Sequence, residues 1–509
     1  MGSAFYVTTP IYYVNSEAHV GTAYTTIAAD VLARYNRACG RRVFFLTGSD
    51  EHGMKMVRAA KDKGLTPEQL VDTLVPKYVE LWKHLNISND NFIRTTDPLH
   101  ARTVQALFGK LIEKGDIYKG TYRGWYCTPC ERYVPQGAAT PPPCPVCNRP
   151  AEHLEEENYF FRMSKYRDRL LALFEERKDF VRPESRRNEV LNRVREGLED
   201  VSVTRSTFEW GVRMPGDEKH VVWVWFDALI NYLSGAGYPH DMAKFAERWP
   251  ADVHLIAKDI LWFHSVIWPS MLMAADIEPP RSIFAHGWWT MNAAKISKSA
   301  GNCIYPMDIT AQFGVDALRF FLLREVPFGG DGDFTHSAFL GRFNNDLGND
   351  LGNLVLRTIT MAEKYFGGIA PAPGVSGTQD DALVNTAKNL EDSVAGHLKN
   401  LQFSHALEAI WQLVRAANRY VEECKPWVLA KNEAEKPRLA TVIYNLLQST
   451  RICAAYLSPF MPGTCEEILW QIGYEKPVSV RLPLDATWGQ YQSGLRLRKG
   501  RPLFPRVEA

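Results

Sequence analysis

The sequence predicts an α/β protein in which a doubly wound parallel sheet is interrupted by a four-cysteine insertion and followed by an α-helical bundle. Three observations support this fold class. Two apolar strand patterns flank a helix pattern near the N-terminus, which describes a βαβ unit. Two CxxC pairs then break the alternation of strands and helices. Beyond residue 345 the apolar residues keep only helical spacing.

The first βαβ unit places polar residues where open sheets bind nucleotides. Residues 4–9 read as a buried strand that Pro10 ends, and residues 43–47 read as a second one. The apolar spacing of residues 19–37 predicts a helix between them. His19 and Gly21 are therefore expected at a helix N-terminus beyond the carboxyl end of a strand, which is an anion site.

The four clustered cysteines predict a structural metal site. Cys127 and Cys130 form one CxxC turn, Cys144 and Cys147 form the second, and thirteen residues separate the two turns. Four thiolates close a tetrahedral shell around zinc and leave no position for a reacting water. Two unrelated turns or redox disulfides remain the alternative. The other five cysteines are scattered and odd in number, unlike a disulfide framework.

The remaining chain continues the pattern of sheet and then bundle. Residues 221–226 and 253–257 read as strands, and residues 366–379 read as a connection between helices. We expect the sheet domain in two halves, 1–116 and 216–290, around an insertion at 117–215. A loop and connecting region at 291–345, a helical domain at 346–487 and a C-terminal peptide at 488–509 follow.

Composition excludes a membrane span and gives no global sign of a nucleic-acid partner. Lys+Arg 59 against Asp+Glu 58 leaves a net charge of +1, so any nucleic acid must be held by local basic patches. No apolar run approaches the roughly 20 residues of a span. The N-terminus has no basic leader, and we expect a cytoplasmic protein.

The stretch Lys295-Ile296-Ser297-Lys298-Ser299 sets two ammonium groups and two hydroxyls within five residues. Such a loop can close over a triphosphate, because lysines neutralise the leaving phosphates and hydroxyls add directional donors. Taken alone, a lysine-serine run is more often a solvated loop.

Together these stretches carry a family resemblance. His19-Val20-Gly21-Thr22 matches in part the "HIGH" motif of the class I aminoacyl-tRNA synthetases, and Lys295–Ser299 matches their "KMSKS" loop. The chain resembles that family over essentially its whole length, most closely its methionyl branch with a single zinc knuckle. The resemblance implies a Rossmann-type catalytic domain, a zinc-ribbon insertion and an anticodon-binding bundle.

The implied reaction joins L-methionine to tRNA(Met), including the initiator tRNA, through a methionyl-adenylate, and releases AMP and pyrophosphate. ATP enters with Mg²⁺, and one structural Zn²⁺ per chain is held by the four cysteines. The chain ends at Ala509 without the appended tRNA-binding domain that the resemblance links to dimers, so we expect a monomer.

The resemblance also implies roles for particular residues. His19, Thr22, Lys295 and Lys298 would be catalytic. Thr22 stands where the family has a second histidine, and it keeps a hydrogen-bond donor but has shorter reach and no cationic form. The lysines would then carry more of the phosphate chemistry. The full ATP-binding set would be His19, Gly21, Thr22, Gly287, Lys295, Ser297, Lys298 and Ser299.

A methionine pocket of aromatic and aliphatic side chains would surround the thioether. Asp50 would hold the substrate ammonium, and Arg205 is a weaker candidate for its carboxylate. For each aromatic residue, ordinary core packing is the alternative. The implied pocket residues are Ile11, Tyr13, Asp50, Trp225, Leu229, Tyr232, Asp259, His264 and Trp268.

Three residues of the bundle would read the CAU anticodon. Asn353 and Arg357 are spaced i and i+4 on one helical face, and Trp427 would stack on a base. A solvent-exposed pair and a helix-end core residue are the alternatives.

Other functions remain possible from the residues alone. Synthetases for leucine, isoleucine and valine carry a longer editing insertion than residues 117–215, and the cysteine enzyme uses an active-site zinc with a smaller pocket. A zinc-ribbon RNA-binding protein or an inactive synthetase relative is the alternative from another class, with Thr22 as the feature in favour of inactivity. Methionine-dependent ATP–pyrophosphate exchange separates all of these.

Overall fold

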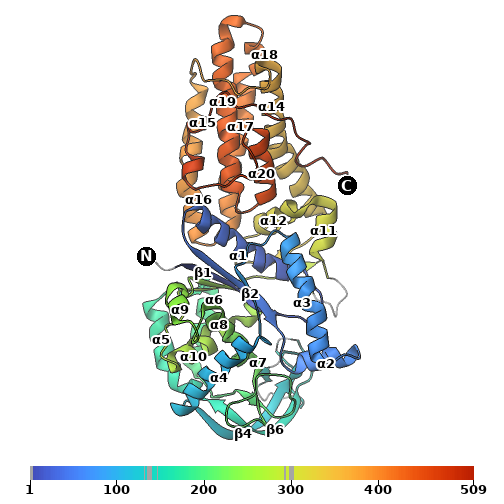
Figure 1. Cartoon of the computed structure of the whole chain (residues 1–509), viewed down its shortest axis with the longest axis vertical. Helices are drawn as coiled ribbons and strands as arrows, with labels where there is room; N and C mark the ends of the chain where they lie inside the picture. The colour runs from blue at the N-terminus through green and yellow to red at the C-terminus, as the bar shows by residue number, and fades with distance from the viewer. Residues whose placement is uncertain are drawn as a thin grey trace. The chain divides into compact units, whose positions relative to one another are not determined.

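Strand β1 (Phe5–Tyr13) lies inside a six-stranded parallel sheet. The computed structural model describes residues 4–130, 132–134, 140–145, 147–291, 294–296 and 303–508 (Figure 1). The chain divides into two units, Met1–Ala29 with Arg42–His286 and Asp30–Arg41 with Gly287–Ala509, so helix α1 (Val20–Ala38) contributes to both.

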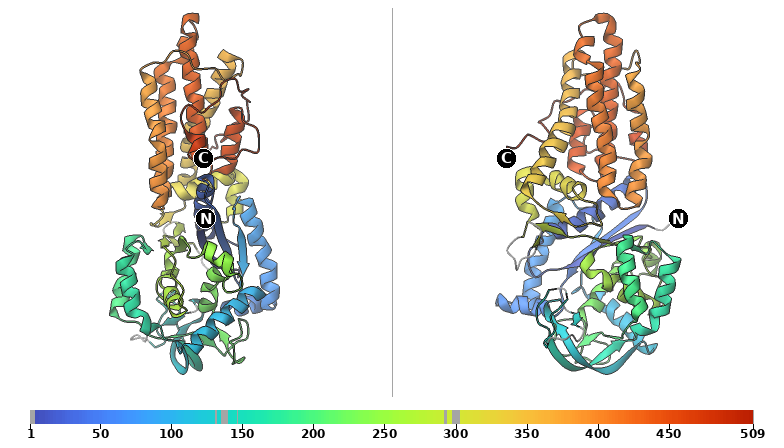
Figure 2. Two further views of the ribbon diagram at one scale, coloured as in Figure 1. Left: turned by 60° about the vertical axis from the view of Figure 1, so that its left-hand side comes forward. Right: turned by 180° about the vertical axis from the view of Figure 1, so that it is seen from behind.

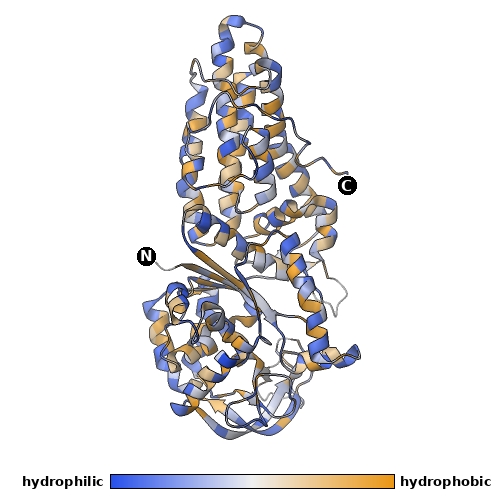
Figure 3. Ribbon diagram, in the orientation of Figure 1, coloured by the Kyte–Doolittle hydropathy of each residue, from blue (hydrophilic) through white to orange (hydrophobic). Residues whose placement is uncertain are grey.

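The sheet of the first unit reverses its strand order beside β1. The order is β3-β2-β1-β11-β12-β7, and every neighbouring pair is parallel. From β1 the sheet continues through β2 and β3 on one side and through β11, β12 and β7 on the other. Open α/β sheets bind ligands at the point where the strand order reverses in this way. Figure 3 shows hydrophobic stretches in the strands beside the N-terminus, and the first five residues of β1 are buried, as expected of a strand covered on both faces. The other strands are β2 (Val43–Asp50), β3 (Asn91–Arg94), β7 (Val181–Arg182), β11 (Val253–Ala257) and β12 (Ile283–His286).

Helices connect these strands and supply most of the unit's core. Its buried cluster runs from Tyr6 and Leu46 in the sheet to Trp268 and Met271 beyond β11. The helices are α2 (Met54–Asp62), α3 (Pro67–His84), α4 (Pro98–Glu113), α7 (Val224–Leu229), α8 (Asn231–Ala236), α9 (Met242–Arg248) and α10 (Trp268–Ala274), with a π-helix η4 at Phe263–Ile267.

The insertion is built on a long antiparallel pair. Strands β4 (Ile117–Cys127) and β6 (Glu152–Phe161) are paired from Ile117 opposite Phe161 to Tyr126 opposite Glu152. β5 (Arg132–Val134) and β8 (Val201–Ser202) complete a sheet in the order β5-β4-β6-β8. This pairing places the first CxxC turn at one end of the sheet. Helices α5 (Arg167–Glu176) and α6 (Glu184–Glu196) and the short pair β9 (Thr204–Arg205) and β10 (Val221–Val222) follow.

Two sequence expectations were wrong in their bounds. Residues 221–226 were expected to form a strand, but β10 ends at Val222 and α7 begins at Val224. β10 pairs with only two residues of β9, and the Asp227 N–H already donates to the Trp223 carbonyl as a helical bond. β1 was expected to end before Pro10, yet it continues to Tyr13 through a register shift between Thr8 and Ile11. The shift accommodates a proline that cannot donate to the sheet.

The second unit joins a small sheet to a helical bundle. β13 (Trp289–Met291) lies between β14 (Ala294–Lys295) and β15 (Gly332–Asp333). From residue 345 onward the described residues form no named strand, which confirms the helical bundle. Figure 2 shows α15, α17 and α19 running side by side. The helices are α11 (Pro306–Phe313), α12 (Val315–Arg324), α13 (His336–Gly341), the π-helix η6 (Arg342–Gly352), α14 (Asn353–Phe366), α15 (Gln379–Lys388), α16 (Leu390–Lys399), α17 (Phe403–Cys424), α18 (Pro426–Leu429), α19 (Lys436–Leu457) and α20 (Pro462–Gln471).

The C-terminal peptide runs back along this unit. The Asn344 side chain bonds the Val507 backbone at both its amide nitrogen and its oxygen, and Ile369 pairs with Arg496. Among the described helices, none combines the length and the apolar character that crossing a membrane requires.

Candidate functional site

The carboxyl ends of β1 and β2 bring two predicted substrate residues together. Tyr13 is opposite Asp50 in the strand register, and Ile11 is opposite Gly48. Asp50 is only 2% exposed. A Cβ at Gly48 would lie 2.1 Å from the Ile93 carbonyl oxygen, so only glycine allows β3 to pack this closely.

His19 folds over the N-terminus of α1. The Gly21 N–H donates to His19 Nδ1 at 3.1 Å, so the proton of the neutral ring is on Nε2. The Thr22 N–H donates to the His19 carbonyl at 2.9 Å. A Cβ at Gly21 would lie 2.9 Å from His19 Cε1, so glycine is what allows the ring to sit here. This arrangement places the ring of His19 at a helix end that favours anions.

Tyr232 and His264 form a buried hydrogen bond of 2.8 Å between the phenol oxygen and Nε2. His264 Nδ1 lies 3.0 Å from the Ile260 carbonyl, which can only accept, so Nδ1 carries the proton and the Tyr232 hydroxyl donates to Nε2. Burial lowers the pKa of His264 to about 4. The ring is therefore neutral at pH 7, and it presents the Tyr232 oxygen in one fixed orientation.

A second buried histidine supports this pair. The His254 ring stacks on Tyr232 at 4.1 Å between centroids, and its Nε2 accepts from Trp268 Nε1 at 3.3 Å. His254 Nδ1 in turn donates to Thr8 Oγ1 at 2.8 Å. Sequence reasoning missed His254, although a histidine inside an apolar strand was a signal that it bonds to a buried partner.

The remaining predicted pocket residues pack around the same cluster. Leu229, Tyr232 and Trp268 belong to the buried core, and Ile11, Tyr13 and Trp225 are half-buried against it. Trp225 stacks on Phe263 at 3.8 Å with the rings nearly parallel. Phe263 was also missed, and its place directly before His264 was the available signal. Asp259 lies exposed on the turn that follows β11.

Arg205 is buried in β9 beside this unit's aromatic residues. Its Nη1 donates to Ser202 Oγ and to the Thr204 carbonyl, and its guanidinium lies 4.9 Å from the Tyr126 ring centroid. These contacts hold the guanidinium in one place, and its predicted role toward the substrate carboxylate stays a prediction.

The second unit carries the remaining predicted nucleotide residues. A Cβ at Gly287 would lie 2.1 Å from the Gly330 carbonyl oxygen, so glycine is required by a close backbone approach. Lys295 lies in β14 opposite Thr290, and the structure describes its backbone. Ser297, Lys298 and Ser299 lie outside the described residues.

The four cysteines of the insertion meet as predicted. The Sγ atoms of Cys127, Cys130, Cys144 and Cys147 all lie within 4.8 Å of one another. Sulfurs bound to one tetrahedral zinc at about 2.3 Å are separated by about 3.8 Å, so this set fits the ion after small shifts. The Asn148 N–H donates to the Cys144 carbonyl and tightens the second CxxC turn. The donors are all sulfur, as expected of a structural site.

The predicted anticodon residues lie on two helices of the bundle. Asn353 is exposed at the start of α14, and Arg357 Nη2 contacts Glu422 Oε1 on α17 at 2.7 Å. Lys425 has a φ of 47° and ends α17, which lets α18 begin at Pro426. Trp427 is 40% exposed on that short helix. An exposed indole can stack on an unpaired base.

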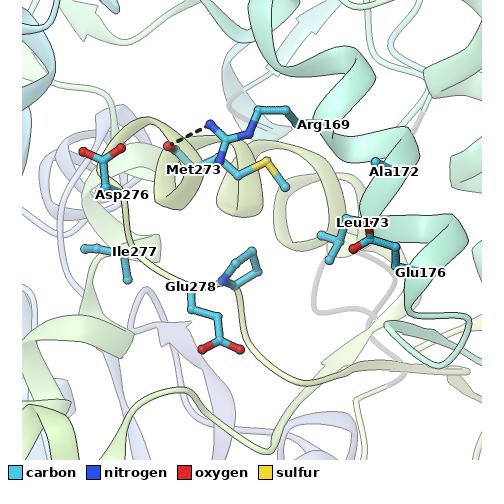
Figure 4. Close-up of a pocket in the computed structure, with 9 residues that line it drawn as sticks. Arg169, Ala172, Leu173, Glu176, Met273, Asp276, Ile277 and Glu278 are labelled. Atoms are coloured by element: carbon cyan, nitrogen blue, oxygen red, sulfur yellow. Dashed lines mark hydrogen bonds between the residues drawn. The ribbon is translucent and has the colours of Figure 1, made fainter.

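A separate pocket of about 490 Å³ lies between α5 and the chain after α10. Figure 4 shows Arg169 reaching the Met273 carbonyl across it. Glu176, Asp276 and Glu278 give its rim carboxylates. None of its lining residues is a predicted site residue, so it plays no part in the candidate site.

Comparison with known proteins agrees with this geometry. The family model described as "tRNA synthetases class I (M)" matches residues 5–153 and 136–359, and the "Anticodon-binding domain of tRNA ligase" matches 380–493. Methionine–tRNA ligase of Caldanaerobacter subterraneus is 50% identical over 509 residues, covering 100% of this chain and 80% of the relative. That of Clostridium tetani is 47% identical over 506 residues, covering 99% and 78%.

Solved structures give the same result. Mycobacterium tuberculosis methionyl-tRNA synthetase in complex with methionyl-adenylate superposes with a TM-score of 0.95 at 41% identity, covering 99% of this chain and 100% of that one. Both the sheet unit and the bundle thus lie inside matched regions. The chain belongs to the methionine–tRNA ligase family of class I aminoacyl-tRNA synthetases and is an enzyme of that class.

Proposed function

We propose that this enzyme activates L-methionine with ATP and transfers it to tRNA(Met) through a methionyl-adenylate. The observation that supports methionine as the substrate is the hydrogen bond between Tyr232 and His264. It lies among buried aromatic residues of the core, and the strand order of the sheet reverses at β1. Apolar packing with one fixed polar group suits a thioether, which is a weak hydrogen-bond acceptor and contacts aromatic rings favourably.

The amino-acid end of the substrate would meet the sheet edge. Asp50 would accept hydrogen bonds from the ammonium, because a carboxylate at a strand end can pair with it directly. Arg205 remains the weaker candidate for the substrate carboxylate, since its Nη1 is already bonded within the protein. Asp259 would lie near the adenosine and the methionine.

The triphosphate would be bound by residues of both sequence motifs, His19–Thr22 and Lys295–Ser299. His19 would donate to it through Nε2, and the positive end of the α1 dipole beside Gly21 and Thr22 would favour its negative charge. Lys295, Ser297, Lys298 and Ser299 would neutralise and orient the leaving phosphates, with Gly287 against the nucleotide. The Mg²⁺ that accompanies ATP would spread the charge that develops on pyrophosphate.

Two displacements complete the reaction. The methionine carboxylate attacks the α-phosphorus, the bond to the β-phosphate oxygen breaks, and pyrophosphate leaves. A terminal adenosine hydroxyl of the tRNA then attacks the mixed anhydride and expels AMP. No protein nucleophile is needed, so the chain's own residues act by positioning the reactants and by stabilising charge.

Methionine-dependent ATP–pyrophosphate exchange tests this function. We expect exchange with the wild type and a loss of at least about tenfold in Lys298→Ala, with the Kd for methionine nearly unchanged, because that lysine acts on the leaving group. Absence of exchange in the wild type with retained tRNA binding would instead support an RNA-binding protein. An unchanged exchange rate in the variant would contradict the role of Lys298.

The proposal also covers the tRNA partner, the bound zinc, the cellular compartment and the oligomeric state. Asn353, Arg357 and Trp427 would read the CAU anticodon of elongator and initiator tRNA, and Zn²⁺ would be held by Cys127, Cys130, Cys144 and Cys147. We propose that the enzyme acts in the cytoplasm, where four thiols stay reduced and available to zinc. Sedimentation in solution tests the expected monomer, and a stable dimer would contradict it.

A further inference from the structure

A buried carboxylate of the first unit plays no part in the reaction described so far. Asp227 is fully buried in the short helix α7. Its Oδ2 lies 2.6 Å from His52 Nδ1, and its Oδ1 lies 2.8 Å from His100 Nε2. His52 and His100 are themselves 7% and 1% exposed. Three ionisable groups thus meet in the apolar core, where such groups are costly unless they bond to one another.

Asp227 is the acceptor at the centre of this cluster. Burial raises its pKa, but His52 and His100 outweigh burial and hold the pKa of Asp227 at about 2. An ionised carboxylate only accepts, so His52 Nδ1 and His100 Nε2 each carry the donated proton. The far nitrogen of His100 lies 2.9 Å from Ser234 Oγ. The chain of contacts therefore runs from His52 through Asp227 and His100 to Ser234.

Three of the four residues in this chain of contacts lie two positions from a predicted methionine-site residue, and His100 bridges two of them. His52 follows Asp50 at the end of β2, and Ser234 follows Tyr232 on α8. Asp227 stands between Trp225 and Leu229 on α7. α7 has only 6 residues, and β10 before it pairs over 2, so local structure alone fixes this helix weakly.

We propose that Asp227 is a positioning residue for methionine binding, which joins the strand end that carries Asp50 to the helices that carry Trp225, Leu229 and Tyr232. The inference rests on the proposed function, because it assumes that these four residues hold the substrate. Bonds to a charged acceptor are shorter and stronger than neutral ones, so Asp227 defines the separation between the ammonium site and the thioether wall.

Asp227→Asn tests the proposal in the full chain. Asparagine has the same shape but replaces one acceptor oxygen with an amide donor, so one histidine N–H loses its partner. We expect the Kd for methionine, measured by calorimetry, to rise at least about tenfold, while the KM for ATP changes less than about twofold. The kcat of exchange at saturating methionine should fall far less than kcat/KM.

A matched control separates positioning from stability. Asp380 in the second unit is also a buried carboxylate, bonded by Arg438 and by the Tyr420 hydroxyl. Asp380→Asn should lower the melting temperature and leave the Kd for methionine at the wild-type value. Equal effects of the two substitutions on that Kd would reduce Asp227 to a structural role and overturn the proposal.

Conservative variants give a second test if Asp227→Asn does not fold. In His100→Gln the amide nitrogen can replace Nε2, and in His52→Asn it can replace Nδ1. Both should keep methionine affinity within about threefold, whereas His100→Leu and His52→Leu should lose about tenfold or more. Equal affinities in the leucine and amide variants would overturn the proposal.

The proposed function and this inference fail in different ways. A wild-type chain that neither binds methionine nor supports exchange overturns both. A wild-type chain that does both, with an Asp227→Asn variant that is folded and binds methionine equally well, overturns only the positioning role.

Discussion

His264 combines the binding role proposed for it with an energetic cost that depends on pH. The folded protein holds it neutral, with a pKa lowered by burial from 6.5 to about 4. Between these values the unfolded chain binds a proton that the folded chain does not. Stability from this residue is therefore complete above pH 6.5 and is lost as the pH falls toward 4.

We predict that His264→Gln flattens this pH dependence. Glutamine can still accept from the Tyr232 hydroxyl but does not titrate. The free energy of unfolding of the wild type should fall by about 3 kcal/mol more than that of the variant between pH 6.5 and pH 4. Denaturant titrations at several pH values measure this difference, and parallel curves would contradict a buried neutral His264.

Gly21 is a residue at which activity and stability should separate. An alanine Cβ would lie 2.9 Å from His19 Cε1, which is a side chain that can swing away. We predict that Gly21→Ala lowers the exchange kcat at least about tenfold by displacing His19, with a small change in melting temperature. Gly109→Ala is the control, because its Cβ would have no neighbour within 4 Å and alanine favours helix by up to about 1 kcal/mol. Equal activity of the two variants would contradict a role for the His19 position.

At the scale of elements, the cysteine insertion is held at one end by four sulfurs. Among the residues of the insertion that the structure describes, its local hydrophobic cluster contains four buried members, Cys127, Val134, Cys144 and Ala151. So small a core buries little apolar surface and contributes little to the folding free energy of the insertion. Metal binding must therefore supply the rest of that free energy.

We predict one zinc per chain and a marked loss of thermal stability when it is removed by a chelator. Cys144→Ser should lose the metal, and cobalt substitution in the wild type should give the absorption of a tetrahedral thiolate site. Cys39→Ser, at an exposed cysteine outside the insertion, should keep the full metal content. Full metal content in Cys144→Ser would show that these sulfurs are not the ligands.

The sequence-based prediction was also wrong at a short element. Residues 221–226 form a continuous apolar run, as a buried strand does, yet α7 starts at Val224. The carboxylate of Asp227 is buried in α7, and its partners His52 and His100 come from distant segments. No local pattern contains that information, because periodicity reports only which face is buried.

At the scale of the whole molecule, methionine binding and anticodon reading are assigned to residues of different units. The predicted methionine residues belong to the first unit, and Asn353, Arg357 and Trp427 belong to the second. Methionine activation and tRNA recognition can therefore be tested separately.

We predict that Trp427→Ala lowers kcat/KM for tRNA(Met) aminoacylation by about 10- to 100-fold, the range expected for one lost stacking contact. ATP–pyrophosphate exchange should stay at the wild-type rate, since it needs no tRNA. Val428→Ala on the same helix, at a residue 50% exposed, is the matched control. A parallel loss of exchange would show that Trp427 acts on folding instead.

Much of the site was predictable because it follows local rules. His19 and Gly21 were expected at a helix N-terminus after the first strand, and the structure places them there. The cysteine spacing predicted a common centre, and the four sulfurs lie within 4.8 Å. The aromatic pocket residues came from family resemblance, since an aromatic residue in isolation looks like ordinary core.

The sequence by itself determined the fold class, the order of its parts and the cysteine cluster, because each depends on periodicity or spacing within a short stretch. Only the tertiary structure decided which buried polar groups pair: His254 with Trp268, Tyr232 with His264, and Asp227 with two histidines. The physical reason is that a buried polar group must find a partner, and the partner is chosen by packing between segments up to 175 residues apart.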